Sequence, residues 1–207
     1  ARFMVIASPA GAYFKGGVKP VSIWLSQDLA RACDGGTGAA KCGGNYASSL
    51  LPTNIAAENG CAQVLFTDSA TDDTIDELGG MNLFLVHRDG KLITPALNGN
   101  ILDGITRKSL IRLAEDRGLA VEEREVTVSE WRDGVADGSI TEAFACGTAA
   151  VITPIGQLKG EGGTIVDFGD GAPGELTMSL RSELTGIQLG TREDRHGWLD
   201  VVVPAGA

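Results

Sequence analysis

The most chemically informative stretch of the chain is a glycine-rich segment, Gly35–Tyr46, that carries a single lysine, Lys41. It holds five glycines in twelve residues, so it forms a loop whose backbone can approach a ligand closely. Ala39-Ala40 and Gly43-Gly44 flank the lysine, and their small size leaves room for a planar cofactor. A desolvated lysine amine loses its proton easily and can form an imine. Composition alone favours a surface loop with a solvated lysine.

A phosphate-binding loop is a second interpretation of the same segment. That motif requires Gly-Lys followed by Ser or Thr, because the hydroxyl holds a magnesium ion. Here Ala40 precedes Lys41 and Cys42 follows it. The sequence therefore excludes a phosphate-binding loop.

Two further segments could bind an anion through backbone N–H groups. Gly104 leads into the helix-like sequence that begins at Ile105-Thr106, and the free N–H groups of a helix start favour phosphate. The run Cys146–Ala150 is a strand that enters a turn of small residues and could present N–H groups and a hydroxyl to a carboxylate. For these segments taken alone, an ordinary capped helix and a tight structural turn are the commoner explanations.

Acidic residues cluster twice, and neither cluster points to chemistry by itself. The run Asp72–Gly80 predicts a solvated turn, and nothing in its pattern singles out Glu77. The glutamates of the range 122–125 predict a solvated strand face.

The pattern of apolar residues predicts short strands mixed with helices and no regular βαβ rhythm. This favours an α+β fold over a doubly wound parallel sheet. We expect helices over 47–59, over 107–117 and from Leu176 to near Gly190, and a short one that opens at Ser129 or Glu130. We expect strands over 4–7, 21–25, 63–68, 82–87, 91–94, 121–128, 142–146 and 151–155.

Length and charge exclude several classes of protein. The 207 residues suffice for one large domain, and a net charge of −10 disfavours nucleic acid and anionic membranes as partners. Four scattered cysteines and two histidines offer no metal-binding spacing. No apolar stretch approaches the roughly 20 residues of a membrane span. These features predict a cytoplasmic protein without a bound metal.

Taken together, these segments resemble the branched-chain aminotransferases among the fold-type IV pyridoxal-phosphate enzymes. The similarity follows the order of the motifs from residue 1 to about residue 198. The chain most resembles the actinobacterial members of this group. It rests on Gly35–Tyr46, Glu77–Phe84, Gly104–Arg107 and Gly147–Ala150. The resemblance implies the large domain of such an enzyme, in which a mixed-sheet pseudo-barrel is surrounded by helices.

The resemblance also implies a role for each site residue. Lys41 would form the Schiff base with pyridoxal 5'-phosphate and then act as the proton-transferring base. Tyr46 would bind the phenolic oxygen of the cofactor, and Glu77 would pair with its pyridine nitrogen. The phosphate would be held by Ile105, Thr106 and Thr148, and the substrate carboxylate by the backbone amides of Thr148 and Ala149.

Two departures from relatives are visible in the sequence. Many relatives have threonine at the position of Gly80, so a hydroxyl contact near the cofactor is lost here. Mammalian relatives carry a redox CxxC motif where this chain has Ala150 and Thr153. We therefore expect no thiol switch at this turn.

The family's organisation implies a particular division of this chain. Residues 1–14 would be the last strand of a small N-terminal domain, 15–21 the interdomain connection, and 22–207 the large cofactor-binding domain. The start at Ala1, without an initiator methionine, indicates a chain entered partway. The rest of the N-terminal domain of the same polypeptide, with its arginine clamp on the phosphate, would then be a missing partner.

The expected activity is the transamination of leucine, isoleucine or valine with 2-oxoglutarate by a cytoplasmic homodimer. Small amino acids and 2-oxo acids would be its partners. Two alternatives stay open at this point: another type IV enzyme, either a D-amino-acid aminotransferase or an aminodeoxychorismate lyase, and a catalytically incomplete fragment. Preference among the three amino acids, metabolic direction and oligomer size do not follow from the sequence.

Overall fold

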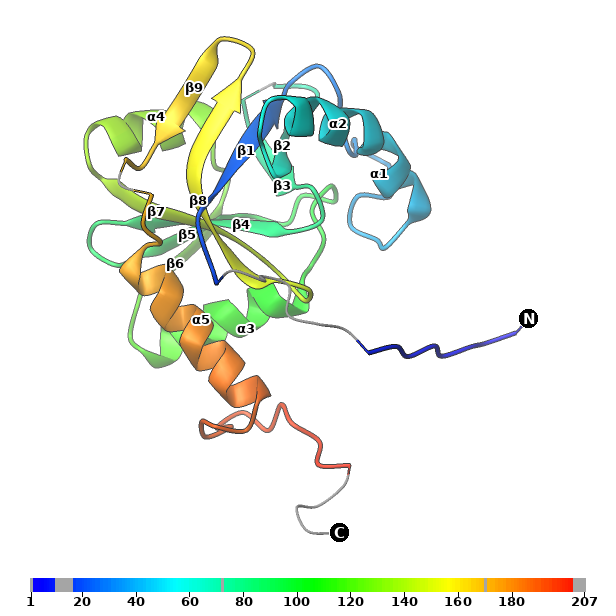
Figure 1. Ribbon diagram of the computed structural model, residues 1–207, viewed down its shortest axis with the longest axis vertical. Coiled ribbons are helices and arrows are strands. Elements are labelled where there is room, and N and C mark those ends of the chain that lie inside the picture. Colours follow the sequence, from blue (N-terminus) through cyan, green and yellow to red (C-terminus); the bar gives the residue numbers. More distant parts are fainter. Residues whose placement is uncertain (1, 10–16, 72, 170, 203–207) are drawn as a thin grey trace.

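A mixed β-sheet forms the centre of the molecule (Figure 1). The structure, a computed structural model, describes residues 2–9, 17–71, 73–169 and 171–202. Within them the sheet runs in the order β3-β2-β1-β8-β7-β4-β5-β6, and β9 pairs with β8. The strands are β1 Val21–Ser26, β2 Gln63–Thr67, β3 Ile75–Leu78, β4 Asn82–His87, β5 Leu92–Pro95, β6 Val121–Arg124, β7 Ile140–Gly147, β8 Val151–Gly160 and β9 Gly163–Asp167.

The directions of the strands confirm the α+β class. Strand β1 is parallel to both of its neighbours, β2 and β8, and β5 is parallel to β6. The remaining pairs are antiparallel, including the long β4-β7-β8 core of the sheet. A doubly wound sheet would be parallel throughout its centre, so the mixed directions exclude it.

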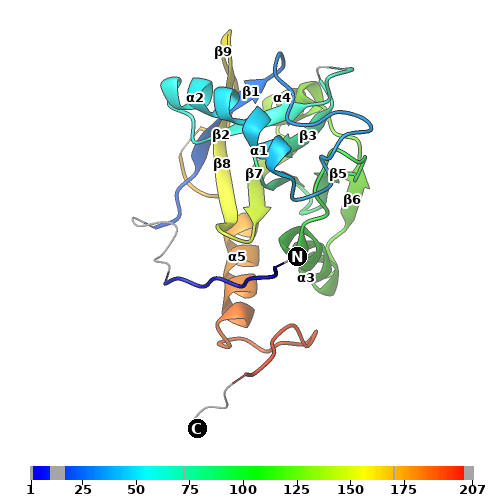
Figure 2. The same cartoon turned by 90° about the vertical axis from the view of Figure 1, so that its right-hand side faces the viewer.

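Helices cover the sheet from several sides in the described part of the chain. Helices α3 and α5 pack together on one face, α4 packs on the other, and α2 covers β1 and β2 (Figures 1 and 2). Their bounds are α1 Gly43–Ser48, α2 Leu50–Glu58, α3 Ile105–Asp116, α4 Val128–Ala136 and α5 Glu175–Gln188.

Strand β4 shows how the sequence builds a core on both faces of the sheet. Successive side chains of a strand point to opposite faces. Leu83 and Leu85 pack with the α4 cluster, whereas Phe84 and Val86 pack with the α3–α5 cluster. All four are buried, so this strand reads as a continuous apolar run.

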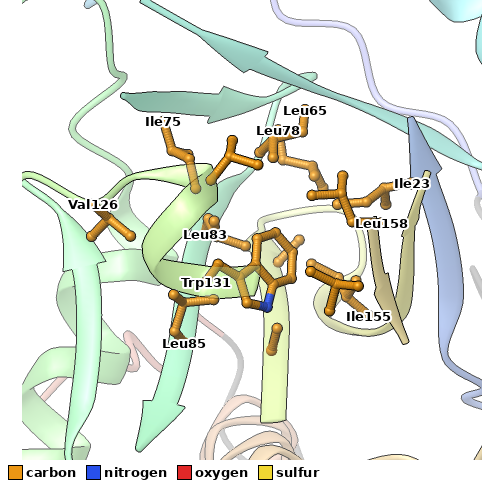
Figure 3. Packing of buried hydrophobic residues seen from close by; sticks show 14 of the residues in the cluster. Ile23, Leu65, Ile75, Leu78, Leu83, Leu85, Val126, Trp131, Ile155 and Leu158 are labelled. Carbon is orange, nitrogen blue, oxygen red and sulfur yellow. The ribbon is translucent and has the colours of Figure 1, made fainter. Parts of the chain in front are cut away.

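Trp131 of α4 fills the middle of the first cluster (Figure 3). Its indole is fully buried and lies among side chains from several strands, including Leu83, Leu85, Ile155 and Leu158. Because Trp131 carries so much apolar surface, α4 is fixed to the sheet largely through this one residue.

The predicted helix over 47–59 is two helices, and Pro52 explains its local design. Helix α1 ends at Ser48, and Ser49 links it to α2. Pro52 therefore lies in the first turn of α2, where the missing N–H has no intrahelical partner to lose. The expected strand over 82–87 has the bounds of β4, and the helix expected from Leu176 to near Gly190 is α5, which begins one residue earlier and ends at Gln188.

Three predictions were wrong. The expected strand over 121–128 ends at Arg124, and helix α4 already begins at Val128. The acidic run Asp72–Gly80 is not a solvated turn, because β3 runs through it and both Asp76 and Glu77 are buried. Their carboxylates find polar partners inside the fold, which hydrophobic patterning cannot reveal. The expected buried strand at Met4–Ala7 is also absent, since residues 2–9 lie exposed and unpaired. Residues 10–16 of the expected domain boundary lie outside the described residues.

Candidate active site

The glycine-rich loop is held in shape by one buried amide, Asn45. Its Nδ2 donates to the carbonyl oxygens of Thr37 at 2.8 Å and Ala40 at 3.0 Å. The Thr37 hydroxyl donates back to Oδ1 of Asn45 at 2.8 Å. These three bonds tie Asn45 to Thr37 and Ala40 across the loop. They therefore position Lys41, the residue that follows Ala40.

The loop is also packed against the segment that leads to α3. A Cβ at Gly38 would collide with the backbone of Asn100, so only glycine permits this contact. The N–H of Ala39 donates to the carbonyl of Gly99 at 2.9 Å. The prediction that the loop backbone approaches another group closely is therefore confirmed. The group that it approaches is the backbone of Gly99 and Asn100 in the same chain.

Lys41 and Tyr46 project from the loop toward a pocket. The Lys41 amine lies 3.2 Å from the Tyr46 hydroxyl, and both side chains are exposed. The adjoining pocket has a volume of about 450 Å³. Its lining comes from the loop, the β3–β4 turn with the start of β4, the start of α3 and the β7–β8 turn: Lys41, Gln63, Gly80, Met81, Asn82, the range 102–106 and the range 146–150.

A second, much smaller cavity adjoins the first. Lys41, Gly80 and Leu102 line both cavities, and Glu77 and Tyr46 line the smaller one. Lys41 therefore lies between Glu77 on one side and the α3 and β7–β8 segments on the other.

Glu77 is a buried anion with a buried cation beside it. Its side chain is 1 % exposed, and the guanidinium of Arg31 pairs with its Oε2. The N–H of Leu102 donates to the same oxygen at 3.4 Å. Burial raises the pKa of Glu77 to about 7, and the positive charges of Arg31 and Lys41 oppose this rise.

The start of α3 presents backbone N–H groups to the pocket. Gly104 is the N-cap and no side chain caps the helix. The N–H groups of Ile105 and Thr106 precede the first intrahelical bond, which Lys108 makes to Gly104. A Cβ at Gly104 would collide with Asn82, whose Nδ2 holds the carbonyl of Leu102 at 2.9 Å. This helix start fits an anion.

The β7–β8 turn lies opposite, and its geometry is unusual. Thr148 and Ala149 are exposed at the pocket, while Ala150 is buried. Val151, which follows, has a φ of 61°. Among the described residues it is the one non-glycine residue with positive φ, and a β-branched side chain strongly disfavours that conformation.

Every residue predicted for the site from the sequence lies at these two cavities. Lys41, Tyr46 and Glu77 gather around the smaller one, whereas Ile105, Thr106, Thr148 and Ala149 line the larger one. Sequence reasoning missed Arg31, Asn45 and Arg181. Arg31 and Asn45 flank the glycine-rich loop, but no pattern indicates their contacts.

The cysteines and acidic residues offer no sign of a metal site. No group of three or more His, Cys, Asp or Glu side chains is placed to hold a metal within the described residues. The four cysteines are free thiols. No helix in the described part of the chain is both long and apolar enough to cross a membrane.

The fold and the pocket define the class of protein. Residues 9–158 match the Amino-transferase class IV family, and the chain belongs to this family. The curled mixed sheet with helices around it is the fold expected of that class.

Particular relatives point to one branch of the family. The chain is 57 % identical over 201 residues to the branched-chain-amino-acid aminotransferase of Mycobacterium tuberculosis, covering 96 % of this chain and 54 % of that protein. Its structure resembles the Escherichia coli branched-chain amino acid aminotransferase, with a TM-score of 0.77, 34 % identity, and coverage of 93 % and 60 % of the two chains. The Thermobaculum terrenum enzyme in its PLP form matches with a TM-score of 0.70 at 34 % identity, covering 84 % and 52 %. The chain thus spans about half the length of the curated relatives it matches.

Proposed function

We propose that this chain is the cofactor-binding part of a branched-chain amino acid aminotransferase that uses pyridoxal 5'-phosphate. The observation that carries the proposal is the convergence of Lys41, Glu77, the α3 start and the β7–β8 turn on one pocket. The structurally similar Thermobaculum terrenum enzyme is described in a PLP form, and we transfer the cofactor to this chain on this basis.

The residues of the pocket fit this cofactor chemically. Arg31 and Leu102 both contact Oε2 of Glu77, and we assign the other oxygen, Oε1, to a protonated ring nitrogen in the smaller cavity. The uncapped start of α3 suits the phosphate, with the N–H groups of Ile105 and Thr106 as donors. When bound, the cofactor withdraws electrons from the substrate Cα and thereby makes its proton acidic.

Lys41 then has two tasks in this proposal. Its amine would hold the cofactor, and as a free base it would move the proton between the substrate Cα and the cofactor C4′. Tyr46 lies 3.2 Å from the amine and would orient it while binding the phenolic oxygen. Glu77 keeps the ring nitrogen protonated, and the hydrogen-bonded loop around Asn45 keeps Lys41 within reach.

The substrate class follows from the relatives, and the binding contacts from the turn. We assign branched-chain amino acids as the substrates, because relatives such as the Mycobacterium tuberculosis protein are named branched-chain-amino-acid aminotransferases. Leucine, isoleucine and valine, with 2-oxoglutarate as acceptor, are the substrates that we propose, as expected from the sequence. The exposed amides of Thr148 and Ala149 are suited to the α-carboxylate. Residues outside this sequence would complete the aliphatic pocket, since the relatives are about twice as long.

The proposed organisation has three further parts. We assign residues 22–207 to the large domain, 15–21 to the connection and 1–14 to the last strand of a smaller domain. The exposure of Phe3, Met4, Val5 and Ile6, each at 75 % or more, supports a covering partner for this segment. We also propose a cytoplasmic homodimer, as expected from the sequence.

The test is to trap the cofactor on its lysine. The purified protein is incubated with pyridoxal phosphate, reduced with borohydride and mapped by mass spectrometry. We expect the pyridoxyl group on Lys41, and finding it on Lys91 or Lys108 would overturn the assignment. Profiling with L-leucine, D-alanine and aminodeoxychorismate then identifies the reaction, because turnover of either of the last two alone would indicate another class IV enzyme.

A further inference from the structure

Arg181 lies outside the pocket and yet holds the turn that lines it. This residue belongs to α5, and its Nη1 donates to the carbonyl oxygens of Ala150 at 2.6 Å and Ile152 at 3.1 Å. These two carbonyls flank Val151. One guanidinium nitrogen therefore bridges the backbone across the residue that carries the unusual φ of 61°.

The conformation of Val151 needs such support. A non-glycine residue in the left-handed region costs on the order of 1–3 kcal/mol, and a valine there is a rare outlier. Without an external hold, the turn would relax toward a conformation with negative φ at Val151. That change would redirect the peptide groups of Ala149 and Thr148, which lie two and three residues before Val151.

The surroundings of Arg181 are suited to a firm hold. Its side chain is partly buried where α5 packs against β7 and β8, and this burial lowers the pKa of the guanidinium. A desolvated cation forms stronger hydrogen bonds to carbonyl oxygens than a solvated one. Helix α5 is itself anchored in the core by Leu180, Leu184 and Ile187. The backbone of Arg181 is therefore held in place.

We propose that Arg181 is a positioning residue for substrate recognition, which holds the strained turn at Val151 so that the Thr148 and Ala149 amides face the substrate carboxylate. The inference rests on the proposed function for its ligand, but the contact and the strain do not depend on it. Arg181 itself touches neither substrate nor cofactor in this proposal.

The first experiment compares Arg181→Met with the wild-type protein. We expect the KM for leucine and the Kd for 4-methylpentanoate, which is leucine without its amino group, to rise about tenfold, as for the loss of two hydrogen bonds. The value of kcat should change less than twofold, and the affinity for pyridoxal phosphate less than about threefold, because Ile105 and Thr106 of the α3 start hold the phosphate besides Thr148. Arg132→Met is the matched control, because Arg132 is exposed on α4 and pairs only locally with Asp133. A tenfold loss of cofactor affinity in Arg181→Met would contradict a role confined to the turn.

The second experiment tests whether Arg181 acts through Val151. Glycine adopts a positive φ without cost, so Val151→Gly should make the turn less dependent on the arginine. Arg181→Met should therefore raise KM less than threefold in the Val151→Gly background. Val151→Asn provides a second such background, since asparagine tolerates the left-handed region. Equal losses in all three backgrounds would overturn the proposal.

Hydrogen–deuterium exchange separates this inference from the proposed function. We expect the peptide over 147–152 to exchange about ten times faster in Arg181→Met, and markedly less so in the double variant with Val151→Gly. Unchanged exchange would refute the hold on the turn even in an active enzyme. A protein that shows the exchange effect but does not transaminate would refute the proposed function and leave the positioning of the turn established.

Discussion

The guanidinium of Arg31 pairs with the carboxylate of Glu77 in the interior of the protein, and both side chains are almost fully buried. The partners come from a loop before the glycine-rich segment and from strand β3. Arg31 also donates to the carbonyl oxygens of Gly38 and Asn100, so it links the lysine-bearing loop to the carboxylate. The charge of Glu77 and the position of Lys41 therefore depend on the same side chain.

Replacing Arg31 by methionine should destabilise the protein and favour protonation of Glu77. A buried charge that loses its partner costs about 3–5 kcal/mol. We expect Arg31→Met to lower the free energy of unfolding by about that amount at pH 8, measured by urea denaturation of the cofactor-free protein. The double variant Arg31→Met/Glu77→Gln should recover part of the loss, because no charge is then left unpaired. Equal stability of the single and double variants would contradict the pairing.

The pH dependence of stability should carry the signature of Glu77. Its pKa is about 7 in the folded protein and 4.5 ordinarily, so the folded state binds more protons between these values. Stability of the cofactor-free protein should fall as pH rises through this window, by about 3 kcal/mol at most from this group. Denaturation at pH 5 and pH 8 should show a smaller difference in Glu77→Gln.

A matched variant shows whether that effect is specific. Asp76, the neighbour of Glu77 in β3, is also buried, and burial raises its pKa, partly offset by the amide of Asn98 at 2.7 Å. Asp76→Asn should reduce the pH dependence as well, and the two effects are to be compared. The exposed carboxylates Asp89 and Asp116 have lowered pKa values because of their partners, so they add stability that is lost only on acidification below the window. If Glu77→Gln leaves the pH dependence of stability unchanged, another group causes that dependence.

The four thiols should differ widely in reactivity. Hydrogen bonds from the backbone of Gly44 and the side chain of Thr37 lower the pKa of Cys42, whereas burial raises that of Cys146. Because the thiolate is the reactive form, iodoacetamide at pH 8 should modify Cys42 early and Cys146 last. Timed alkylation followed by peptide mapping measures the order. Early modification of Cys146 in folded protein would contradict its burial.

Trp131 should tolerate phenylalanine far better than alanine. Its indole N–H meets no acceptor among the described residues, so losing this group removes an unsatisfied donor. We expect Trp131→Phe to change the free energy of unfolding by less than about 1.5 kcal/mol, as for a conservative core exchange. Trp131→Ala should cost about 3–5 kcal/mol because it leaves a large cavity. Thermal or urea denaturation of the two variants tests this order.

Apolar periodicity predicted most of the elements because burial imposes it directly. Strand β4 and helix α5 have strong patterns, and their predicted bounds agree with the structure to within about two residues. Strand β3 was missed because its buried side chains include two carboxylates, which a hydrophobicity pattern assigns to solvent. Such a strand forms only when distant partners such as Arg31 and Asn98 neutralise or bind the acids.

The candidate site was predicted from family resemblance more than from local chemistry. Composition alone gave no reason to choose Glu77, and the motif order supplied it. The supporting residues escaped both kinds of reasoning, since Arg181 lies 30 residues from Val151 in the sequence and its hydrogen bonds to the turn go to the backbone oxygens of Ala150 and Ile152. Contacts to backbone leave no trace in the identity of the partner residue, so sequence patterns cannot reveal them.

Strand β7 and helix α5 are fastened to each other at both ends of the strand. Near the start of β7, the carboxylate of Glu142 accepts from the N–H groups of Leu176 at 3.0 Å and Thr177 at 2.8 Å, in the first turn of the helix. Beyond its end, Arg181 holds the turn. Helix α5 therefore stabilises the turn, and local unfolding of the helix would release it. The glycine-rich loop, which is bonded to Asn45 on another part of the sheet, would still keep Lys41 in place. Warming should therefore weaken substrate recognition at a lower temperature than cofactor binding. The two halves of the pocket would then differ in thermal stability.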